Sequence, residues 1–196
     1  MLILASRSAA RNALLAGAGL KFESRPARID ERQQSANAAA AGLDAVATAK
    51  ALAEAKAEAV AAENPGRIVI GADQTLECEG RLLHKVADMA AAREQLRGLR
   101  GRTHYLHSGV ALAREDGVMW SAVETAALRM RDFSNSELET TLALEGDAVL
   151  TSVGCYRLEG PSIRLFERIE GDYFTILGLP LLPLLSALRQ YAPKLL

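Results

Sequence analysis

The stretch Ile68–Gly80, IVIGADQTLECEG, decides the fold class of this 196-residue chain. It opens with three apolar residues followed by Gly71 and Ala72, a pattern typical of a strand that is buried on both faces of a sheet. We predict that the strand stops at Asp73 and places its carboxylate at the strand end. Ligands of open α/β sheets bind at such ends, so Asp73 is the first candidate for a functional residue.

Strands and helices alternate on both sides of this stretch. Residues 27–41 are polar and Ala-rich, and we expect a mobile loop there. The capping box Ser134-x-x-Glu137 marks the start of one helix. The other patterns predict a strand over 2–5, a helix within 6–19, a strand over 21–26, a helix over 44–62, a hairpin turning at Glu79-Gly80, a helix within 87–101, a long hairpin turning at Asp116-Gly117, a strand over 163–169 and a C-terminal helix after Pro180.

This alternation predicts an α/β fold, and the hairpins predict a mixed sheet rather than a purely parallel one. The chain contains no internal repeat and no low-complexity linker. We therefore expect a single domain over residues 1–196.

Composition excludes several classes of partner. The net charge of -1 provides no basic surface for DNA, RNA or an anionic membrane, so no stable nucleic-acid complex is expected. No apolar run approaches the roughly 20 residues of a membrane span. Cys78 and Cys155 are isolated from each other and lack the spacing of zinc ligands, which fits a reducing cytoplasm. The expectation is a cytoplasmic globular protein that binds phosphates, if at all, through a local cluster.

The first such cluster is Ser6, Ser8 and Arg11, between the first strand and the first helix. Two hydroxyls, the free N–H groups of a helix start and a guanidinium could form a small anion site. The competing interpretation is that one serine caps the helix and Arg11 is solvated. From this stretch alone, the competing interpretation is favoured.

Acidic and basic residues elsewhere could complete the site. Glu31 follows the second strand, and together with Asp73 it could hold a hard divalent cation such as Mg²⁺. Lys56 lies close to the apolar stripe of its helix, although a lysine there often extends its ammonium to solvent. Lys85 closes the hairpin that begins at Thr75, so it is expected to return towards Asp73.

Six stretches taken together carry more information than any one of them. They occur in a fixed order over nearly the whole chain: LILASRSAAR, IDE, LAEAKAEAV, GADQTL, LRGRTHYLHSGV and RIEGDYFTILGLPL. In this set the sequence resembles the Maf family of nucleoside triphosphate pyrophosphatases. The resemblance implies an elongated α/β fold with two lobes around a central cleft, related in architecture to inosine triphosphate pyrophosphatases.

The resemblance also implies an activity and a set of residues. Maf proteins split a nucleoside triphosphate into a monophosphate and pyrophosphate, with a divalent cation such as Mg²⁺ or Mn²⁺. By motif, the residues carried over are Asp73 as the catalytic carboxylate, Glu31 and Asp73 towards the metal, and Ser6, Ser8, Arg11, Lys56 and Lys85 towards the substrate.

Three positions bear on substrate specificity. Ala10 replaces the bulky residue that usually follows the S-x-S opening, which removes a large side chain expected near the base. Gln74 follows the catalytic aspartate, as in the 7-methyl-GTP branch of the family, and Glu159 stands where the dTTP/UTP branch tends to carry Gln. The last two positions place the chain closer to the 7-methyl-GTP branch, whereas the loss of an aromatic face at Ala10 argues against simple transfer.

Three functions are compatible with this pattern. The leading one is metal-dependent hydrolysis of nucleoside triphosphates, with modified nucleotides such as 7-methyl-GTP as candidate substrates in a house-cleaning role. The alternative is a nucleotide-binding regulator of cell division or septum formation that does not depend on turnover. The third is a phosphatase that releases orthophosphate. The sequence leaves open whether the chain forms a homodimer.

Overall fold

The computed structural model describes residues 1–196. Its internal contacts divide the chain into two compact units. Unit 1 comprises Met1–Gln74, His107–Thr125 and Asp172–Leu196, and unit 2 comprises Thr75–Leu106 and Ala126–Gly171. Three long strands, β3, β5 and β6, contribute residues to both units.

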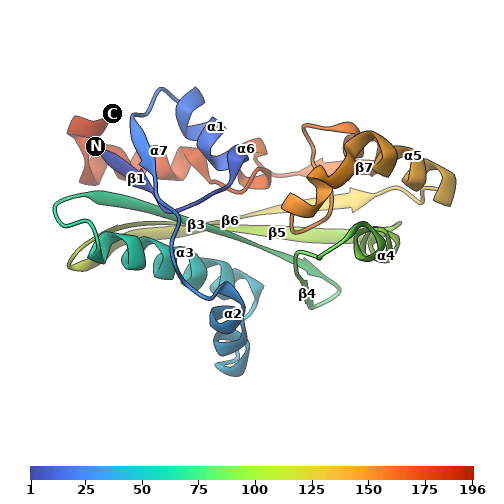
Figure 1. Ribbon diagram of the computed structural model, residues 1–196, viewed down its shortest axis with the longest axis horizontal. Coiled ribbons are helices and arrows are strands. Elements are labelled where there is room, and N and C mark those ends of the chain that lie inside the picture. Colours follow the sequence, from blue (N-terminus) through green and yellow to red (C-terminus); the bar gives the residue numbers. More distant parts are fainter. The chain divides into compact units, whose positions relative to one another are not determined.

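The helices and strands alternate along the chain (Figure 1). Those of unit 1 that precede β3 are β1 (Leu2–Leu4), α1 (Ala9–Gly17), β2 (Phe22–Ser24), α2 (Glu31–Ala40) and α3 (Ala45–Ala62). The shared strands are β3 (Ile68–Cys78), β5 (Thr103–Arg114) and β6 (Gly117–Met130). Unit 2 adds β4 (Arg81–Leu83), α4 (Met89–Leu99), α5 (Asn135–Glu145), β7 (Phe166–Glu170) and the 3-10 helices η1 (Gly146–Thr151) and η2 (Pro161–Leu165). Unit 1 ends with α6 (Tyr173–Ile176), α7 (Leu181–Tyr191) and the 3-10 helix η3 (Pro193–Leu195).

The strands form one seven-stranded mixed sheet in the order β2-β1-β3-β5-β6-β7, with β4 paired to β3. β1 runs parallel to β2 and to β3, whereas the β3–β4 and β6–β7 pairs are antiparallel. The α/β class and the mixed sheet predicted from the sequence are confirmed.

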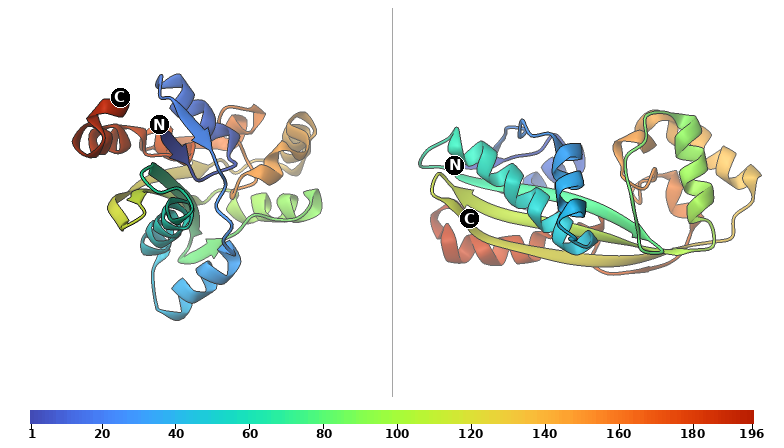
Figure 2. Two further views of the ribbon diagram at one scale, coloured as in Figure 1. Left: turned by 60° about the vertical axis from the view of Figure 1, so that its left-hand side comes forward. Right: turned by 90° about the horizontal axis from the view of Figure 1, so that it is seen from below.

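Unit 1 has a helical layer on each face of its strands (Figure 2). Alternate residues of β1 and β3 point to opposite faces, as the two-residue period of a strand requires. On one face Leu2, Leu4 and Ile70 pack with α1 and α7. On the other face Ile3 and Val69 pack against the small residues of α3. The candidate residue Lys56 of α3 is therefore buried, as are the alanines around it that pack on the sheet.

Two glycines allow α3 to approach the sheet closely. A Cβ on Gly71 of β3 would lie 2.1 Å from the carbonyl oxygen of Ala53, and one on Gly109 of β5 would lie 2.3 Å from that of Ala49. Neither distance is possible for real atoms, so only glycine fits at these positions. The close contact brings the side chains of α3 within reach of polar groups on β3.

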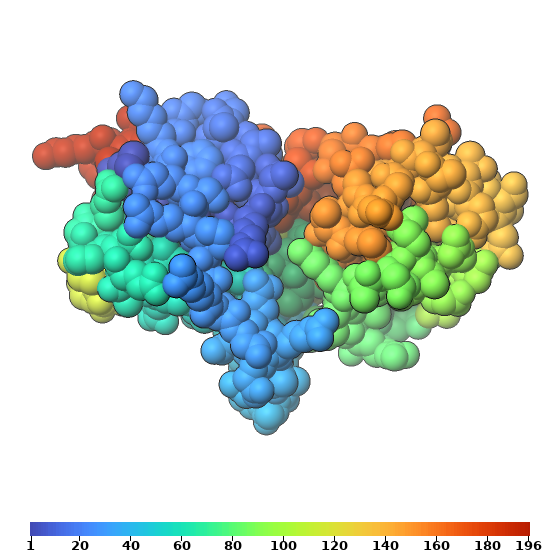
Figure 3. Space-filling view, viewed as in Figure 1, coloured from blue at the N-terminus to red at the C-terminus, as the bar shows by residue number.

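The predicted mobile loop over 27–41 is wrong, because α2 occupies most of that segment. Asp30 caps the helix by accepting a hydrogen bond from the Gln33 N–H at 3.0 Å, and the alanines that follow favour helix. Ala38 is its one buried residue. The helix projects from the body of unit 1 (Figure 3). Because α2 buries so little apolar surface, its sequence shows no helical period of apolar residues, and the sequence analysis missed it.

The predicted end of the central strand is also wrong. β3 continues past Asp73 to Cys78, where it pairs with β4 in the register Leu76↔Leu83. Asp73 is thus an interior residue of a long strand, and its charge is accommodated by a side-chain partner on α3 rather than by a strand end. The hairpin turn at Glu79 and Gly80 is as predicted, and both residues have positive φ.

Near the C-terminus two further boundaries differ. Residues 161–165 form η2, which begins at Pro161, so the predicted strand over 163–169 starts only at Phe166. The short helix α6 was not predicted, because its four residues are too few to show a helical period. The C-terminal helix after Pro180 is as expected.

Candidate active site

The centre of the candidate site is the ammonium group of Lys56. Its Nζ lies 2.9 Å from Oε1 of Glu31 and also contacts Oδ1 of Asp73. The side chains of Lys56 and Asp73 are 8% and 11% exposed, whereas that of Glu31 is 61% exposed. Three predicted site residues that are distant in sequence therefore meet in unit 1, two of them buried. The Lys56 side chain is buried. The alternative interpretation, in which its ammonium extends to solvent, is therefore wrong.

Three different elements supply these residues. Lys56 lies on α3 among the alanines that pack on the sheet, Asp73 lies on β3, and Glu31 is the first residue of α2. The two carboxylates converge on the Lys56 ammonium, and their remaining oxygens are of the kind that a hard cation such as Mg²⁺ takes, with water and substrate oxygens completing its shell. No group of three or more His, Cys, Asp or Glu side chains forms a complete protein cage. The residues fit a metal that shares its ligands with a substrate.

Arg11 joins three segments of unit 1. Its Nε donates to the carbonyl of Gly178 at 2.7 Å, and one terminal nitrogen donates to the carbonyl of Ala72 at 2.9 Å and to Oγ of Ser6 at 3.3 Å. Burial lowers the pKa of Arg11, while Asp73 and Glu31 oppose that effect. Arginine remains charged in any case, so a half-buried cation lies beside the two carboxylates. The competing interpretation supposed that the Arg11 side chain is solvated, and these hydrogen bonds show that it is not.

The two serines have structural contacts in the free chain. Ser8 caps α1 by accepting from the Arg11 N–H at 3.3 Å, as the competing interpretation supposed. Ser6 accepts from the Ser8 N–H at 3.2 Å. The half-buried Ala10 lies in the first turn of α1. The opening motif thus forms a turn held by its own hydroxyls.

Gln74 follows Asp73 and points its amide at α6. Its Nε2 lies 2.8 Å from Oγ of Ser108 and 3.1 Å from the carbonyls of Thr175 and Ile176. The Ser108 hydroxyl also donates to the carbonyl of Thr175, at 2.7 Å. The donor side of the amide is therefore already used, and only its carbonyl oxygen remains for a ligand.

Lys85 and Glu159 belong to unit 2 and are both exposed. Lys85 follows β4 by two residues, beyond the last paired residue Leu83. Glu159 lies in the segment between η1 and η2. Their predicted roles remain predictions that rest on their motifs.

Sequence reasoning missed the buried carboxylate Glu145, the last residue of α5. It accepts hydrogen bonds from the backbone and hydroxyl of Ser162 at 2.9 and 2.8 Å and from Arg157 at 2.9 Å. Only its position in LALEG, directly before a helix-ending glycine, is visible in the sequence, and that position does not reveal burial. Ser108 was also missed, because nothing in the sequence around it reveals that this serine is buried.

The cysteines and His104 take no part in this site. Both cysteines are buried and free, and burial raises the pKa of Cys155 to about 11, which leaves it an inert thiol at neutral pH. Burial lowers the pKa of His104 to about 4, so its ring is neutral under ordinary conditions. These groups are packed residues of unit 2.

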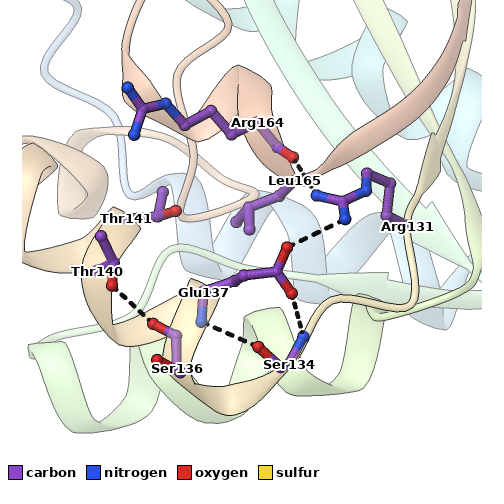
Figure 4. Close-up of a pocket in the computed structure, with 8 residues that line it drawn as sticks. All are labelled: Arg131, Ser134, Ser136, Glu137, Thr140, Thr141, Arg164 and Leu165. Atoms are coloured by element: carbon purple, nitrogen blue, oxygen red, sulfur yellow. Dashed lines mark hydrogen bonds and ion pairs between the residues drawn. The ribbon is translucent and has the colours of Figure 1, made fainter.

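Unit 2 contains a cavity of about 300 Å³ that is lined by none of the candidate site residues (Figure 4). In its wall Arg131 donates to Oε1 of Glu137 and to the carbonyl of Arg164, both at 3.0 Å. Glu137 and Ser134 form the predicted capping box of α5. Arg131 and Glu137 in this lining pair with each other, and no candidate site residue lines the cavity, so we assign it to the helix start and not to the chemistry.

No helix of the chain is both long enough and apolar enough to cross a membrane.

Comparisons with known proteins agree with the residue pattern. The family model described as Maf-like protein matches residues 1–191. A nucleoside triphosphate pyrophosphatase of Nitrobacter winogradskyi is 56% identical over 190 residues, covering 96% of this chain and 92% of the relative. One of Granulibacter bethesdensis is 52% identical, covering 97% and 96%. A 7-methyl-GTP pyrophosphatase of Rhizobium meliloti is 53% identical, also covering 97% and 96%. With a match over nearly its whole length and relatives above 50% identity, the chain belongs to the Maf family.

Proposed function

We propose that this protein hydrolyses nucleoside triphosphates to nucleoside monophosphates and pyrophosphate. The observation that carries the proposal is the contact of the buried Lys56 ammonium with both Glu31 and Asp73. Buried charges are costly, and such a cluster is typical of a functional site. The names of the relatives from Nitrobacter, Granulibacter and Rhizobium support the same activity.

In this mechanism Asp73 holds the attacking water and accepts its proton as the water attacks the α-phosphorus. Its fixed place inside β3 supplies the orientation that general-base catalysis needs. Lys56 has three N–H donors, of which two are directed at carboxylates, so the third is left for a phosphate oxygen. Arg11 holds the opening loop against β3 and adds positive charge beside the phosphates.

Glu31 and Asp73 are proposed to hold a divalent cation, Mg²⁺ or Mn²⁺, and such a cation neutralises charge on phosphate oxygens when bound. The Ser6 and Ser8 hydroxyls and Lys85 are proposed to contact the phosphates, as the family motif implies. This chemistry needs no residue beyond those that the sequence had already identified.

For the base we propose a guanine-type or modified purine, with 7-methyl-GTP as the first candidate. A carboxylate at Glu159 can accept hydrogen bonds from the N1–H and amino group of guanine, and it favours the positive charge of a 7-methylated ring. The Rhizobium relative, named for this substrate, supports the choice. Gln74 is proposed to act through its free carbonyl oxygen. Ala10 leaves space near the base, so discrimination is expected to be broad.

The test is a panel of 7-methyl-GTP, GTP, dTTP and UTP with Mg²⁺ or Mn²⁺, scored for pyrophosphate and monophosphate. We expect pyrophosphate release, with a higher kcat/KM for 7-methyl-GTP than for dTTP or UTP. A preference for dTTP or UTP would overturn the proposed specificity but not the activity. Tight binding without any pyrophosphate would support the non-catalytic regulator, and orthophosphate as the product would support the phosphatase.

A further inference from the structure

Glu145 holds the segment that carries Glu159. Its carboxylate has no exposed surface, and it contacts Arg157 on one side of Glu159 and Ser162 on the other. Arg157 binds it through two nitrogens, at 2.9 and 2.8 Å. Ser162 binds it through the backbone N–H and the hydroxyl. Both ends of a six-residue segment are thus bonded to one charged group.

The backbone of this segment lies directly on the carboxylate. A Cβ on Gly160 would lie 2.5 Å from Oε1 of Glu145, so no other residue fits there without displacing one of the two. The φ of Gly160 is -124°, which any residue can adopt. This glycine is therefore required for space and not for its backbone freedom.

The hydrogen-bond partners of Glu145 stabilise its ionised form. Burial alone would raise the pKa of Glu145, but the hydrogen bonds from Ser162 and Arg157 together lower it. The group therefore remains ionised at neutral pH. Hydrogen bonds to an ionised acceptor are about twice as strong as neutral ones. Glu159 itself is exposed, and its position follows from how firmly its neighbours are held.

We propose that Glu145 is a positioning residue for substrate selection: it fixes residues 157–162 and so sets where Glu159 presents its carboxylate to the base. The inference rests on the proposed function, since Glu159 must first select the base. Glu145 does not touch the substrate. Its removal is expected to weaken discrimination without removing the catalytic carboxylate Asp73.

The experiment is a cycle of Glu145→Gln, Glu159→Gln and the double variant. The measured quantity is the ratio of kcat/KM for 7-methyl-GTP to that for dTTP. Glu145→Gln replaces a doubly accepting carboxylate by an amide that cannot accept from both Arg157 and Ser162 at once. We expect the ratio to fall about tenfold, mainly through KM for 7-methyl-GTP, which is within the usual range for coupled residues. In the Glu159→Gln background the same change should alter the ratio less than about twofold.

Glu137→Gln is the matched control. Glu137 lies on the same helix and caps the helix start, and its hydrogen bonds are to Arg131 and Ser134 rather than to residues 157–162. It should lower the melting temperature and leave the ratio unchanged. If Glu145→Gln does not fold, Ser162→Ala removes one hydroxyl donor, keeps the backbone donor, and should lower the ratio in the same direction.

The outcomes separate the two proposals. A wild type that releases no pyrophosphate from any nucleotide overturns the proposed function, and the inference with it. An active wild type whose ratio is unchanged by Glu159→Gln overturns the inference, because Glu145 then has no selecting group to hold. So does a Glu145→Gln variant with the wild-type ratio, or one whose effect is equally large with and without Glu159.

Discussion

Lys56 is a buried cation with two anionic neighbours, so its removal should be felt in stability as well as in activity. Replacing it by Met leaves the buried Asp73 without its ion-pair partner, and breaking a buried pair costs about 3–5 kcal/mol of unfolding free energy. We expect Lys56→Met to lose that amount in denaturant unfolding without metal. Mn²⁺ should raise its melting temperature by more than it raises that of the wild type, because the cation replaces the missing charge.

Lys50→Met is the control for this prediction. Lys50 lies on the same helix but is half exposed and pairs with Glu54 at 3.9 Å, so its loss should cost less than about 1 kcal/mol. Equal stabilities of the two variants would show that the Lys56 ammonium is not the counter-ion of Asp73.

Asp73 carries the chemistry in our proposal. Asp73→Asn keeps the shape of the side chain and a possible contact with Lys56, but it loses charge and basicity. Turnover should fall about 10²–10⁴-fold, the usual contribution of a general base. Steady-state kinetics and circular dichroism on the same sample test this. A folded variant that keeps more than about a tenth of the wild-type rate would show that Asp73 is not the base.

We expect His104 to make the stability of the fold depend on pH. Its Nε2 lies 2.7 Å from the hydroxyl of Tyr156, and its buried Nδ1 has no hydrogen-bond partner. Because its pKa is lowered to about 4 in the fold, the unfolded chain binds the proton more readily between about pH 6.5 and 4. Stability should thus be complete above pH 6.5 and fall as the pH decreases towards 4, by roughly 3 kcal/mol in total.

His104→Gln cannot titrate and should lack that part of the pH dependence. The measurement is the free energy of unfolding at several pH values between 4 and 7, with the exposed His84→Gln as control. Identical slopes for wild type and His104→Gln would contradict the assignment.

At the scale of elements, the contact between α3 and β3 sets the geometry of the site. Gly71→Ala would place a methyl group 2.1 Å from the Ala53 carbonyl, so the helix must move away from the sheet. We expect a loss of about 1–3 kcal/mol, as in other overpacked cores, together with reduced turnover because Lys56 moves with the helix. Chemical denaturation and kinetics on one preparation measure both effects.

Gly98→Ala should behave in the opposite way. Gly98 lies near the end of α4 with open space around its Cα, so alanine should stabilise the helix by about 0.5–1 kcal/mol. If both glycine variants had the same effect, close packing would not be the reason for Gly71.

The elements with strong local signals were predicted from the sequence. The capping box at Ser134 and Glu137 located α5, and the alanine-rich pattern located α3. α2 was missed because it buries almost no apolar surface, which is the feature that produces a visible period. The length of β3 was misjudged because Asp73 was expected to end the strand. A buried carboxylate inside a strand needs a charged partner, and the sequence does not show that Lys56 of α3 is that partner.

Some residues of the candidate site were predicted from the sequence and others were not. The motif resemblance identified Glu31, Lys56 and Asp73, and the structure brings all three together. Glu145 was not predicted, since its burial depends on a close contact with Gly160 from a later segment. Contacts between distant segments arise from tertiary packing and leave no local pattern.

At the scale of the whole molecule, the proposed catalytic carboxylate Asp73 and the proposed selecting carboxylate Glu159 belong to different units. Unit 1 holds Glu31 and Asp73, the buried cation Lys56 and the half-buried cation Arg11. Unit 2 holds Glu159 and the carboxylate that positions its segment. Changes to these carboxylates and cations should thus act on the rate of the chemical step, and changes around Glu145 should act on the choice of nucleotide.

The position of bond cleavage tests the central claim most directly. Hydrolysis of 7-methyl-GTP or GTP in ¹⁸O-labelled water, followed by mass spectrometry of the products, shows which phosphorus the water attacks. The account predicts one ¹⁸O atom in the nucleoside monophosphate and none in the pyrophosphate. Label in the pyrophosphate, or labelled orthophosphate as the main product, would contradict it.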